Sequence, residues 1–355
     1  MRSAIVSRRG RTIGLALALL ALASCGGGGG SSAPPTPPSK LFFVDAGNHA
    51  IVSSVNAAPT LGSTFPINRI VEGSNTGLGL PGGTPSTSTL PSIALDAAND
   101  RLYVSTQLNV VVFNGISTAD GNVGFSRRFQ AAGVNFLGLS LDTLNNLLYT
   151  VDPQGVVRIF TGASGLNNTV VPARTLTPDF GSATIVTTFG IAVDNTTNNL
   201  LYIGMALNGA TSIFVYSNAS GVNSPTPVAP DQNLHFAFGL TSFYLDAVHD
   251  RLYAAQFDGK ILVFDSAHTL TTGTPVPNRT IDLMDGVGHF IFVDAGVRDK
   301  LYAVGNNILG NPMNHDLLFG NNASTADDAA QQAPVVLAVP FQDSSVALSA
   351  VAVSP

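Results

Sequence analysis

The feature that most constrains the fold is a repeat of about fifty residues. Each unit has a short apolar segment ending in aspartate, then a polar turn and a second segment containing Leu-Tyr. Five units occur, and the spacings between their aspartates are 46, 52, 52 and 48 residues. Five of the seven tyrosines occupy the Leu-Tyr position. The recurring aspartates are Asp96, Asp142, Asp194, Asp246 and Asp294. A period of this length predicts an array of supersecondary units.

Each unit continues with a third apolar run and often with a fourth that contains arginine. The third run is represented by 110–113 and 261–264, and the fourth by 174–176 and 279–281. Four short β-rich segments, broken by glycine, asparagine, aspartate and proline, are typical of one blade of a β-propeller. The segments are apolar on both faces more often than they alternate. We therefore expect blades that pack face to face with both surfaces buried.

The two ends of the repeat region complete each other. Residues 41–44 look like a Leu-Tyr segment without the aspartate-bearing segment before it, and residues 348–354 look like that missing segment. Pairing of the two would remove exposed sheet edges. The prediction for residues 40–355 is thus an all-β fold, a six-bladed β-propeller of four-stranded blades, closed by pairing of the C-terminal strand with the N-terminal blade. The recurring aspartates are expected to hold turns, because a carboxylate at a strand end accepts backbone N–H groups.

The N-terminal region has the pattern of an export signal. Four arginines lie within the first eleven residues, and residues 13–23 form an apolar stretch too short to span a bilayer. Leu22-Ala23-Ser24-Cys25 resembles the lipobox of bacterial lipoproteins, and Cys25 is the only cysteine. The resemblance implies a signal peptide at 1–24 and a lipid on Cys25. Residues 25–39, rich in Gly, Ser and Pro, would form a tether. The protein is then exported and lipid-anchored to the bacterial cell envelope, with the outer membrane favoured over the inner because Gly26 follows the cysteine.

The repeat resembles the YVTN family of β-propellers and the broader NHL-like and lactonase-like propellers. The likeness covers residues 40–355 and rests on Asn-x-Leu-Tyr, Val-x-Val-Phe, Arg-x-Ile and Gly-Ile-Ala-Val-Asp. The families include binding proteins, scaffolds and hydrolases, so the resemblance implies a fold more than an activity. The chain departs from YVTN proteins in its six expected blades, where seven are common. It also contains no tryptophan.

Functional residues are expected where the repeats differ from one another. In a propeller, the loops between second and third strands and the loops that lead into first strands share the face at the mouth of the channel. The candidate binding residues on that face are His49, Gln107, Asp152, Asn208, His235, Asp258, His289 and Asn306. No cofactor is predicted, although some of these oxygens suit a divalent cation such as calcium, and no metal ligand is assigned.

Two functions follow from these residues. The first is a membrane-anchored extracytoplasmic binding or interaction module whose partner is an envelope protein, a glycan or a small ligand. The alternative is a metal-dependent, lactonase-like hydrolase with its site in the central channel, although Glu72 is the only glutamate and no convergent catalytic set is recognisable. The first function is preferred, and an enzyme is left open. The net charge of −6 argues against a nucleic-acid partner.

Overall fold

The computed structural model describes residues 40–45, 49–54, 67–78, 92–106, 108–282, 287–294, 299–306, 315–321, 323, 325, 335–338 and 348–354. Almost every regular element among these residues is a strand, and the exceptions are three short 3-10 helices. No helix within these ranges is long and apolar enough to cross a membrane. The expected signal peptide, Cys25 and the tether lie outside the described residues.

Five sheets each come from one segment of the chain, and we number them 2 to 6 in chain order. Sheet 2 contains β4 (Ile93–Asp96), β5 (Arg101–Ser105), β6 (Val110–Asn114) and β7 (Arg127–Gln130). Sheet 3 contains β8 (Gly138–Asp142), β9 (Leu147–Val151), β10 (Val157–Thr161) and β12 (Arg174–Pro178). Sheet 4 contains β13 (Ile185–Asp194), β14 (Leu200–Leu207), β15 (Ala210–Ser217) and β17 (Gln232–Phe236).

The last two of these sheets follow the same four-strand plan. Sheet 5 contains β18 (Leu240–Asp246), β19 (Arg251–Gln256), β20 (Lys260–Asp265) and β21 (Arg279–Asp282). Sheet 6 contains β22 (Val287–Asp294), β23 (Lys300–Asn306), β24 (His315–Asn321) and β25 (Val335–Ala338). The 3-10 helices are η1 (Ala97–Asn99), η2 (Ala163–Gly165) and η3 (Ala267–Thr269). Four consecutive antiparallel strands per repeat confirm the predicted all-β propeller class.

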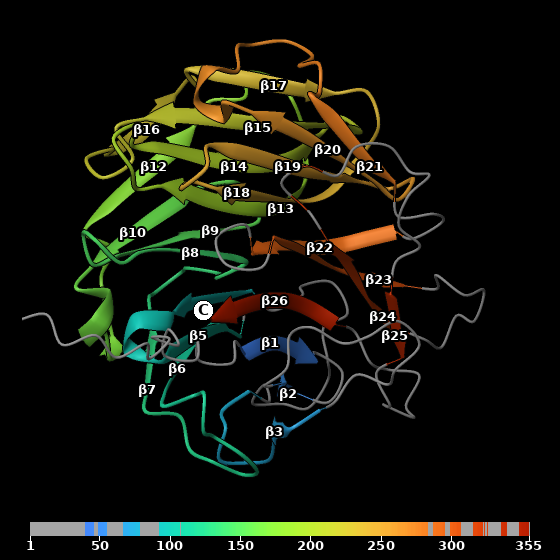
Figure 1. Cartoon of the computed structure of the whole chain (residues 1–355). Coiled ribbons are helices and arrows are strands. Elements are labelled where there is room, and N and C mark those ends of the chain that lie inside the picture. Colours follow the sequence, from blue (N-terminus) through green and yellow to red (C-terminus); the bar gives the residue numbers. More distant parts are fainter. Residues whose placement is uncertain are drawn as a thin grey trace, which may run out of the picture. The chain divides into compact units, whose positions relative to one another are not determined.

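Sheet 1 joins the two ends of the described chain. It contains β26 (Leu348–Ser354), β1 (Lys40–Asp45), β2 (Ala50–Ser54) and β3 (Arg69–Val71). β26 pairs antiparallel with β1, with Phe43 opposite Val351 and Lys40 opposite Ser354 (Figure 1). The first strands of neighbouring sheets pack against one another in the order β4, β8, β13, β18, β22 and β26, and β26 packs in turn against β4. The expected pairing of the chain's ends is therefore present.

The core lies between neighbouring sheets, as the two-sided apolar pattern predicts. The five Leu-Tyr tyrosines are at most 1% exposed, and their leucines are also buried. One cluster joins Tyr149 and Ile159 of sheet 3 to Leu201 and Phe214 of sheet 4. Because adjacent strand residues point to opposite faces, each sheet supplies one set of side chains to each neighbour. The core is thus a series of layers between sheets.

Short segments of one sheet also cover the outer edge of the sheet before it. β11 (Asn168–Thr169) pairs parallel with β7, and β16 (Ser224–Val228) pairs parallel with β12. Single bridges join Val71 to Gly121 and Leu234 to Gly273 in the same manner. Covered edges cannot recruit a strand from another chain, so these outer strands are poor sites for partner binding.

The recurring aspartates hold the turns between first and second strands, as predicted. Four of them accept the backbone N–H of a residue two or three positions later: Asp96 from Asn99, Asp142 from Asn145, Asp194 from Thr196 and Asp246 from His249. The N···O distances run from 2.9 to 3.2 Å. The side chain of Asp294 lies outside the described part of the chain. A residue with this role in each repeat belongs to the scaffold.

Replacing Asp142 tests this scaffold role. Its Oδ1 accepts the N–H of Asn145 at 3.0 Å and its Oδ2 accepts the Asn145 amide at 2.7 Å, and the side chain is almost fully buried. Asp142→Ala should lower the free energy of unfolding by about 1–3 kcal/mol, because the turn loses hydrogen bonds to a charged, buried acceptor. Asp142→Asn keeps one acceptor oxygen and should cost less than half as much. Urea unfolding of both variants is the measurement, and equal losses would contradict the assignment.

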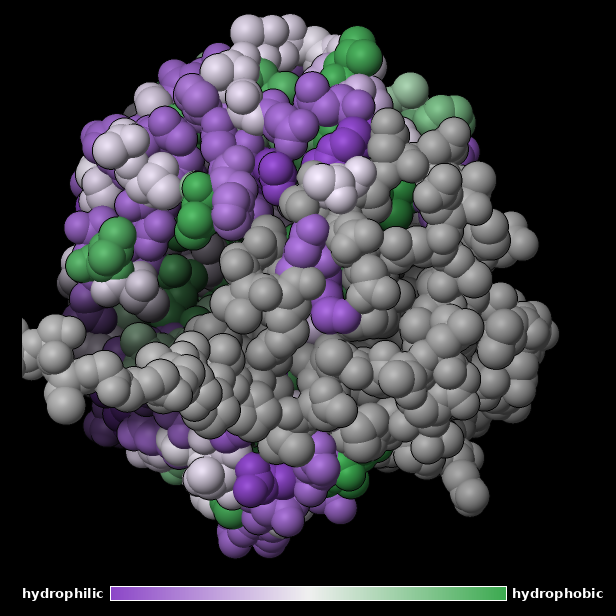
Figure 2. Space-filling model, viewed as in Figure 1, coloured by the Kyte–Doolittle hydropathy of each residue, from purple (hydrophilic) through white to green (hydrophobic). Residues whose placement is uncertain are grey.

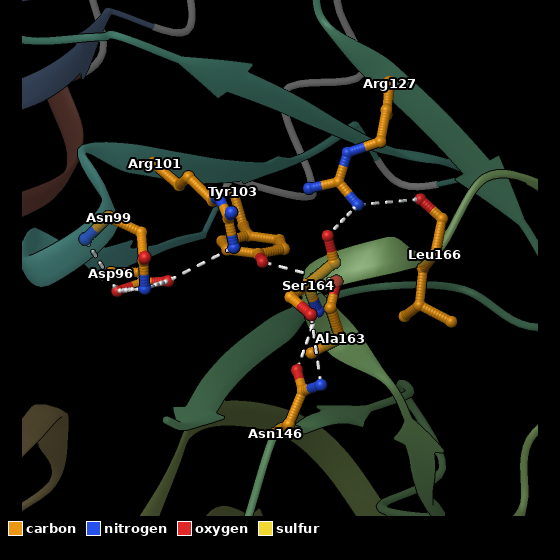
Figure 3. A network of polar contacts seen from close by, with 9 residues as sticks. All are labelled: Asp96, Asn99, Arg101, Tyr103, Arg127, Asn146, Ala163, Ser164 and Leu166. Atoms are coloured by element: carbon orange, nitrogen blue, oxygen red, sulfur yellow. Dashed lines mark hydrogen bonds and ion pairs between the residues drawn. The ribbon is translucent and has the colours of Figure 1, made fainter. Parts of the chain in front are cut away.

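A second contact, which was not predicted, joins sheets 2, 3 and 5 to the sheets that follow them. The Leu-Tyr hydroxyl donates to a carbonyl in the loop after the third strand of the following sheet: Tyr103 to Ala163 at 3.3 Å, Tyr149 to Ala219 at 3.0 Å and Tyr253 to Ala323 at 3.4 Å. An arginine of the fourth strand reaches the same loops. Figure 3 shows Tyr103 and Arg127 of sheet 2 converging on Ala163, Ser164 and Leu166 of sheet 3.

Candidate functional site

The alternating strand direction gives the domain two faces. The turn face carries the aspartate-held turns and the loops between third and fourth strands. The loop face carries the loops between second and third strands and the connections from one sheet to the next. All eight candidate binding residues were expected on the loop face. Among the described ones, His49, Asp152, Asn208 and Asp258 lie in turns of four different sheets and His235 lies on β17 of sheet 4, so they form no single cluster.

Asp152 holds its own loop through both of its side-chain oxygens. Its Oδ1 accepts the N–H groups of Gln154 at 3.0 Å and Val156 at 2.8 Å, and its Oδ2 lies 3.3 Å from Arg158. Burial raises the pKa of this carboxyl, against the opposing effect of the Val156 N–H and Arg158. Both oxygens are thus used within the turn from β9 to β10. The Asp-x-Gln spacing thus makes a side-chain turn, and a binding role for Asp152 stays a prediction.

Asn208 and Asp258 also have local partners, although both are exposed. The Asn208 side-chain oxygen accepts the N–H of Thr184 at 2.9 Å, which ties the β14–β15 hairpin to the loop before β13. Asp258 Oδ2 lies 2.8 Å from Lys260 Nζ. That hydrogen bond raises the pKa of Lys260. The carboxylate of Asp258 therefore has its counter-charge within its own turn.

His235 is exposed and lies beside a serine. Its Nδ1 is 3.0 Å from the Ser212 hydroxyl, and the two residues are cross-strand partners on β17 and β15. Ser212 is only 3% exposed, so a substrate has no access to this hydroxyl. The pair stabilises the outer part of sheet 4, and nothing in its geometry makes it a nucleophile and base.

The remaining candidates are less informative. His49 is half-buried and has a positive φ of 53° immediately before β2, which is typical of a turn residue. Gln107 lies outside the described residues, as do the side chains of His289 and Asn306, whose backbones belong to β22 and β23. Within the described ranges, no three His, Cys, Asp or Glu residues are grouped so that they could hold a metal ion.

The first strands, which pack against one another in sequence, present mainly apolar side chains where they are partly exposed. Ile93, Leu95, Leu141 and Phe243 are examples. Tyr244 of sheet 5 and Phe292 of sheet 6 lie with ring centroids 4.8 Å apart. Hard cations need several oxygen ligands, and these described residues do not offer such a set.

The loop face carries two exposed aromatic residues that the sequence reasoning missed. Phe238, in the connection from sheet 4 to sheet 5, is 63% exposed, and Phe257, in the β19–β20 turn of sheet 5, is 58% exposed. The Phe257 N–H donates to the Gly239 carbonyl at 3.0 Å. We call Phe238, Gly239 and Phe257 the aromatic platform. An apolar residue in a loop is a weak sequence signal, because loops also supply core residues such as Phe136.

Comparisons with known proteins add little. No protein-family model matches the chain, and no curated protein matches it. Among solved structures, the chain is similar to the β-propeller domain of Myceliophteria thermophila Cps50 (Swd1). The similarity covers 69% of this chain and 70% of that chain, with 13% identity and a TM-score of 0.43. The fold assignment accordingly rests on the sheets described above.

Proposed function

We propose that the protein is a membrane-anchored extracytoplasmic binding module that uses the loop face of a closed, six-bladed propeller. In this proposal, sheet 1 is the sixth blade and the lipid on Cys25 anchors the chain to the bacterial envelope, with the outer membrane favoured. The partner is an envelope protein, a glycan or a small ligand. We also propose that the chain is a YVTN-like repeat protein, because its repeat resembles that family.

One observation carries the proposal, namely the contrast between the two faces. The turn face repeats the same aspartate-held turn in sheets 2, 3, 4 and 5. The described loops of the other face differ from sheet to sheet in length and residue type. Both exposed phenylalanines lie on that face. The turn face also has exposed aliphatic side chains, such as Val248 and Val276, but the two exposed aromatic rings belong to the loop face. Aromatic residues are enriched at interfaces.

Anchoring is tested by Cys25→Ala. Without its acceptor cysteine the chain cannot receive a lipid, and we expect it to leave the outer-membrane fraction. Fractionation of cells that produce each form, with metabolic labelling by a radioactive fatty acid, is the measurement. Outer-membrane retention and labelling that equal those of the unchanged chain would contradict the proposed anchor.

Binding through the loop face is tested by photo-cross-linking in intact cells. A benzophenone amino acid at Ala237, which is exposed beside the platform, should give a partner adduct of reduced mobility. The matched control is the same amino acid at Val248, which is 84% exposed on the turn face of sheet 5. Adducts from position 237 alone support the proposal. Adducts from position 248 alone, from both positions equally or from neither would overturn it.

A further inference from the structure

We propose that the aromatic platform binds a neutral carbohydrate polymer, with sugar rings stacked on Phe257 and Phe238. The inference rests on the proposed function, because it assigns a ligand class to the same loop face. The hydrogen-bearing faces of a sugar ring are apolar and flat, so they suit exposed aromatic rings. The platform is the one place on the described loop face where two such rings stand on neighbouring loops.

The ring of Phe257 lies against Gly239, although more than half of the residue is exposed. A Cβ added at Gly239 would lie 2.6 Å from Cδ2 and 2.9 Å from Cε2 of that ring. The ring therefore fills the space that any side chain at position 239 would need. Because Gly239 supports it from below, the ring presents its outer side to solvent without first having to become ordered. A preorganised surface binds at a lower entropic cost.

The loop that carries Phe238 is fastened to both neighbouring sheets. The Thr211 hydroxyl of sheet 4 donates to the Phe238 carbonyl at 3.4 Å and accepts the N–H of Leu240 at 3.0 Å. On the other side, the Gly239 carbonyl accepts the N–H of Phe257 of sheet 5. The backbone segments that carry the two rings are thus joined by one set of hydrogen bonds.

Charge argues against an anionic ligand. Lys260, next to the platform, lies 2.8 Å from Asp258 and opposite Asp282 across the β20–β21 pair, so acidic groups balance its charge. The exposed polar groups nearby are an amide, Asn208 of the β14–β15 hairpin, and a hydroxyl, Thr184 of the loop that is hydrogen-bonded to it. An anionic polymer would therefore meet acidic groups and an already paired lysine in this part of the described surface. Amides and hydroxyls are suitable partners for sugar hydroxyls.

Area argues against a protein partner or a second copy of this chain. An aromatic side chain buries about 150–250 Å² when fully covered, so the two partly exposed rings offer roughly 200–250 Å². A stable protein interface needs about 800 Å² from each partner, more than half of it apolar. In the view of Figure 2, the apolar areas on the described surface are small and separate. Two rings suit one or two sugar units.

The experiment is a pelleting assay with three insoluble neutral polysaccharides: microcrystalline cellulose, insoluble starch and curdlan. The full chain, purified in a non-ionic detergent, should sediment with at least one of them. Phe257→Ala should weaken that binding at least tenfold, and Phe257→Trp should preserve it. Gly239→Ala should also weaken binding several-fold, because it displaces the ring without removing any aromatic group. Leu144→Ala, a turn-face variant, should bind normally.

The outcomes separate the ligand class from the proposed function. Sedimentation with none of the three polymers, or equal binding by Phe257→Ala, overturns the carbohydrate proposal. If either result accompanies protein adducts from position 237 in cells, the loop face binds a protein and the proposed function stands. If position 237 gives no adduct of any kind, the proposed function fails as well. Unfolding of each variant by urea excludes loss of fold, and Phe257→Trp provides the positive control.

Discussion

A chain that lacks residues 348–355 should lose its cooperative unfolding transition. β26 pairs with all six residues of β1 and packs against β4 and β22. Its removal leaves Leu41, Phe42, Phe43 and Val44, each at most 2% exposed, at an open sheet edge. Six paired positions and four buried apolar side chains together contribute several kcal/mol, a large share of the 5–15 kcal/mol by which domains are typically stable. Urea unfolding followed by circular dichroism is the measurement.

Truncation shortens the chain as well as removing the β1–β26 pairing, so a second experiment tests the pairing in the full-length chain. Cysteines at Phe43 and Val351, which are directly opposite, should form a disulfide in a Cys25→Ala background. Cysteines at Phe43 and Ala350 point to opposite faces of the sheet and should not. If the truncated chain unfolds as cooperatively as the full chain, or if the second cysteine pair cross-links as readily as the first, closure through β26 is wrong.

Removing the contacts from sheet 3 to sheet 4 should have the next largest effect. The Tyr149 hydroxyl donates to the Ala219 carbonyl, and the Arg174 guanidinium donates to the adjacent Ser220 carbonyl. Tyr149→Phe should cost about 1–2 kcal/mol and Arg174→Met about 1.5–3 kcal/mol of unfolding free energy. Both side chains hold one loop, so the double variant should lose less than the sum. Burial raises the pKa of Tyr149 to about 12, so the hydroxyl remains a donor and the loss should be constant from pH 6 to pH 9.

Tyr202 provides the matched control for this contact. It occupies the Leu-Tyr position of sheet 4 and is fully buried, yet its hydroxyl has no hydrogen-bond partner among the described residues. Tyr202→Phe should therefore be neutral or slightly stabilising, because an unpaired buried hydroxyl is unfavourable. Equal losses for Tyr149→Phe and Tyr202→Phe would show that the hydroxyl contact between sheets contributes nothing.

The parts of the fold that could be predicted are those that the sequence repeats. Apolar runs of fixed order predict four strands per unit, and aspartate at a strand end predicts a held turn, because both depend on near neighbours along the chain. The partner of Arg174 could not be found in this way, since its acceptor lies 46 residues away in another sheet. Recurrence of arginine at the start of the fourth run was the available signal, and it does not reveal what the guanidinium contacts.

The candidate site was predicted less well, for two physical reasons. Polar residues in loops were read as ligands, but Asp152 and Asp258 use their oxygens within their own turns. Exposed apolar residues were passed over, because sequence cannot tell a buried loop phenylalanine from an exposed one. Phe136 is 1% exposed and Phe238 is 63% exposed, although both lie in connections between sheets.

The central claim is that the two faces have separate roles, the turn face in stability and the loop face in binding. Asp142→Ala and Phe257→Ala, measured side by side, test it most directly. The two measurements are the urea midpoint and the yield of the cross-linked adduct from position 237. Asp142→Ala should lower the urea midpoint but keep the adduct yield when equal amounts of folded protein are compared. Phe257→Ala should keep the urea midpoint and reduce the adduct yield at least fivefold. A Phe257→Ala chain with full adduct yield, or an Asp142→Ala chain with unchanged stability, would contradict the claim.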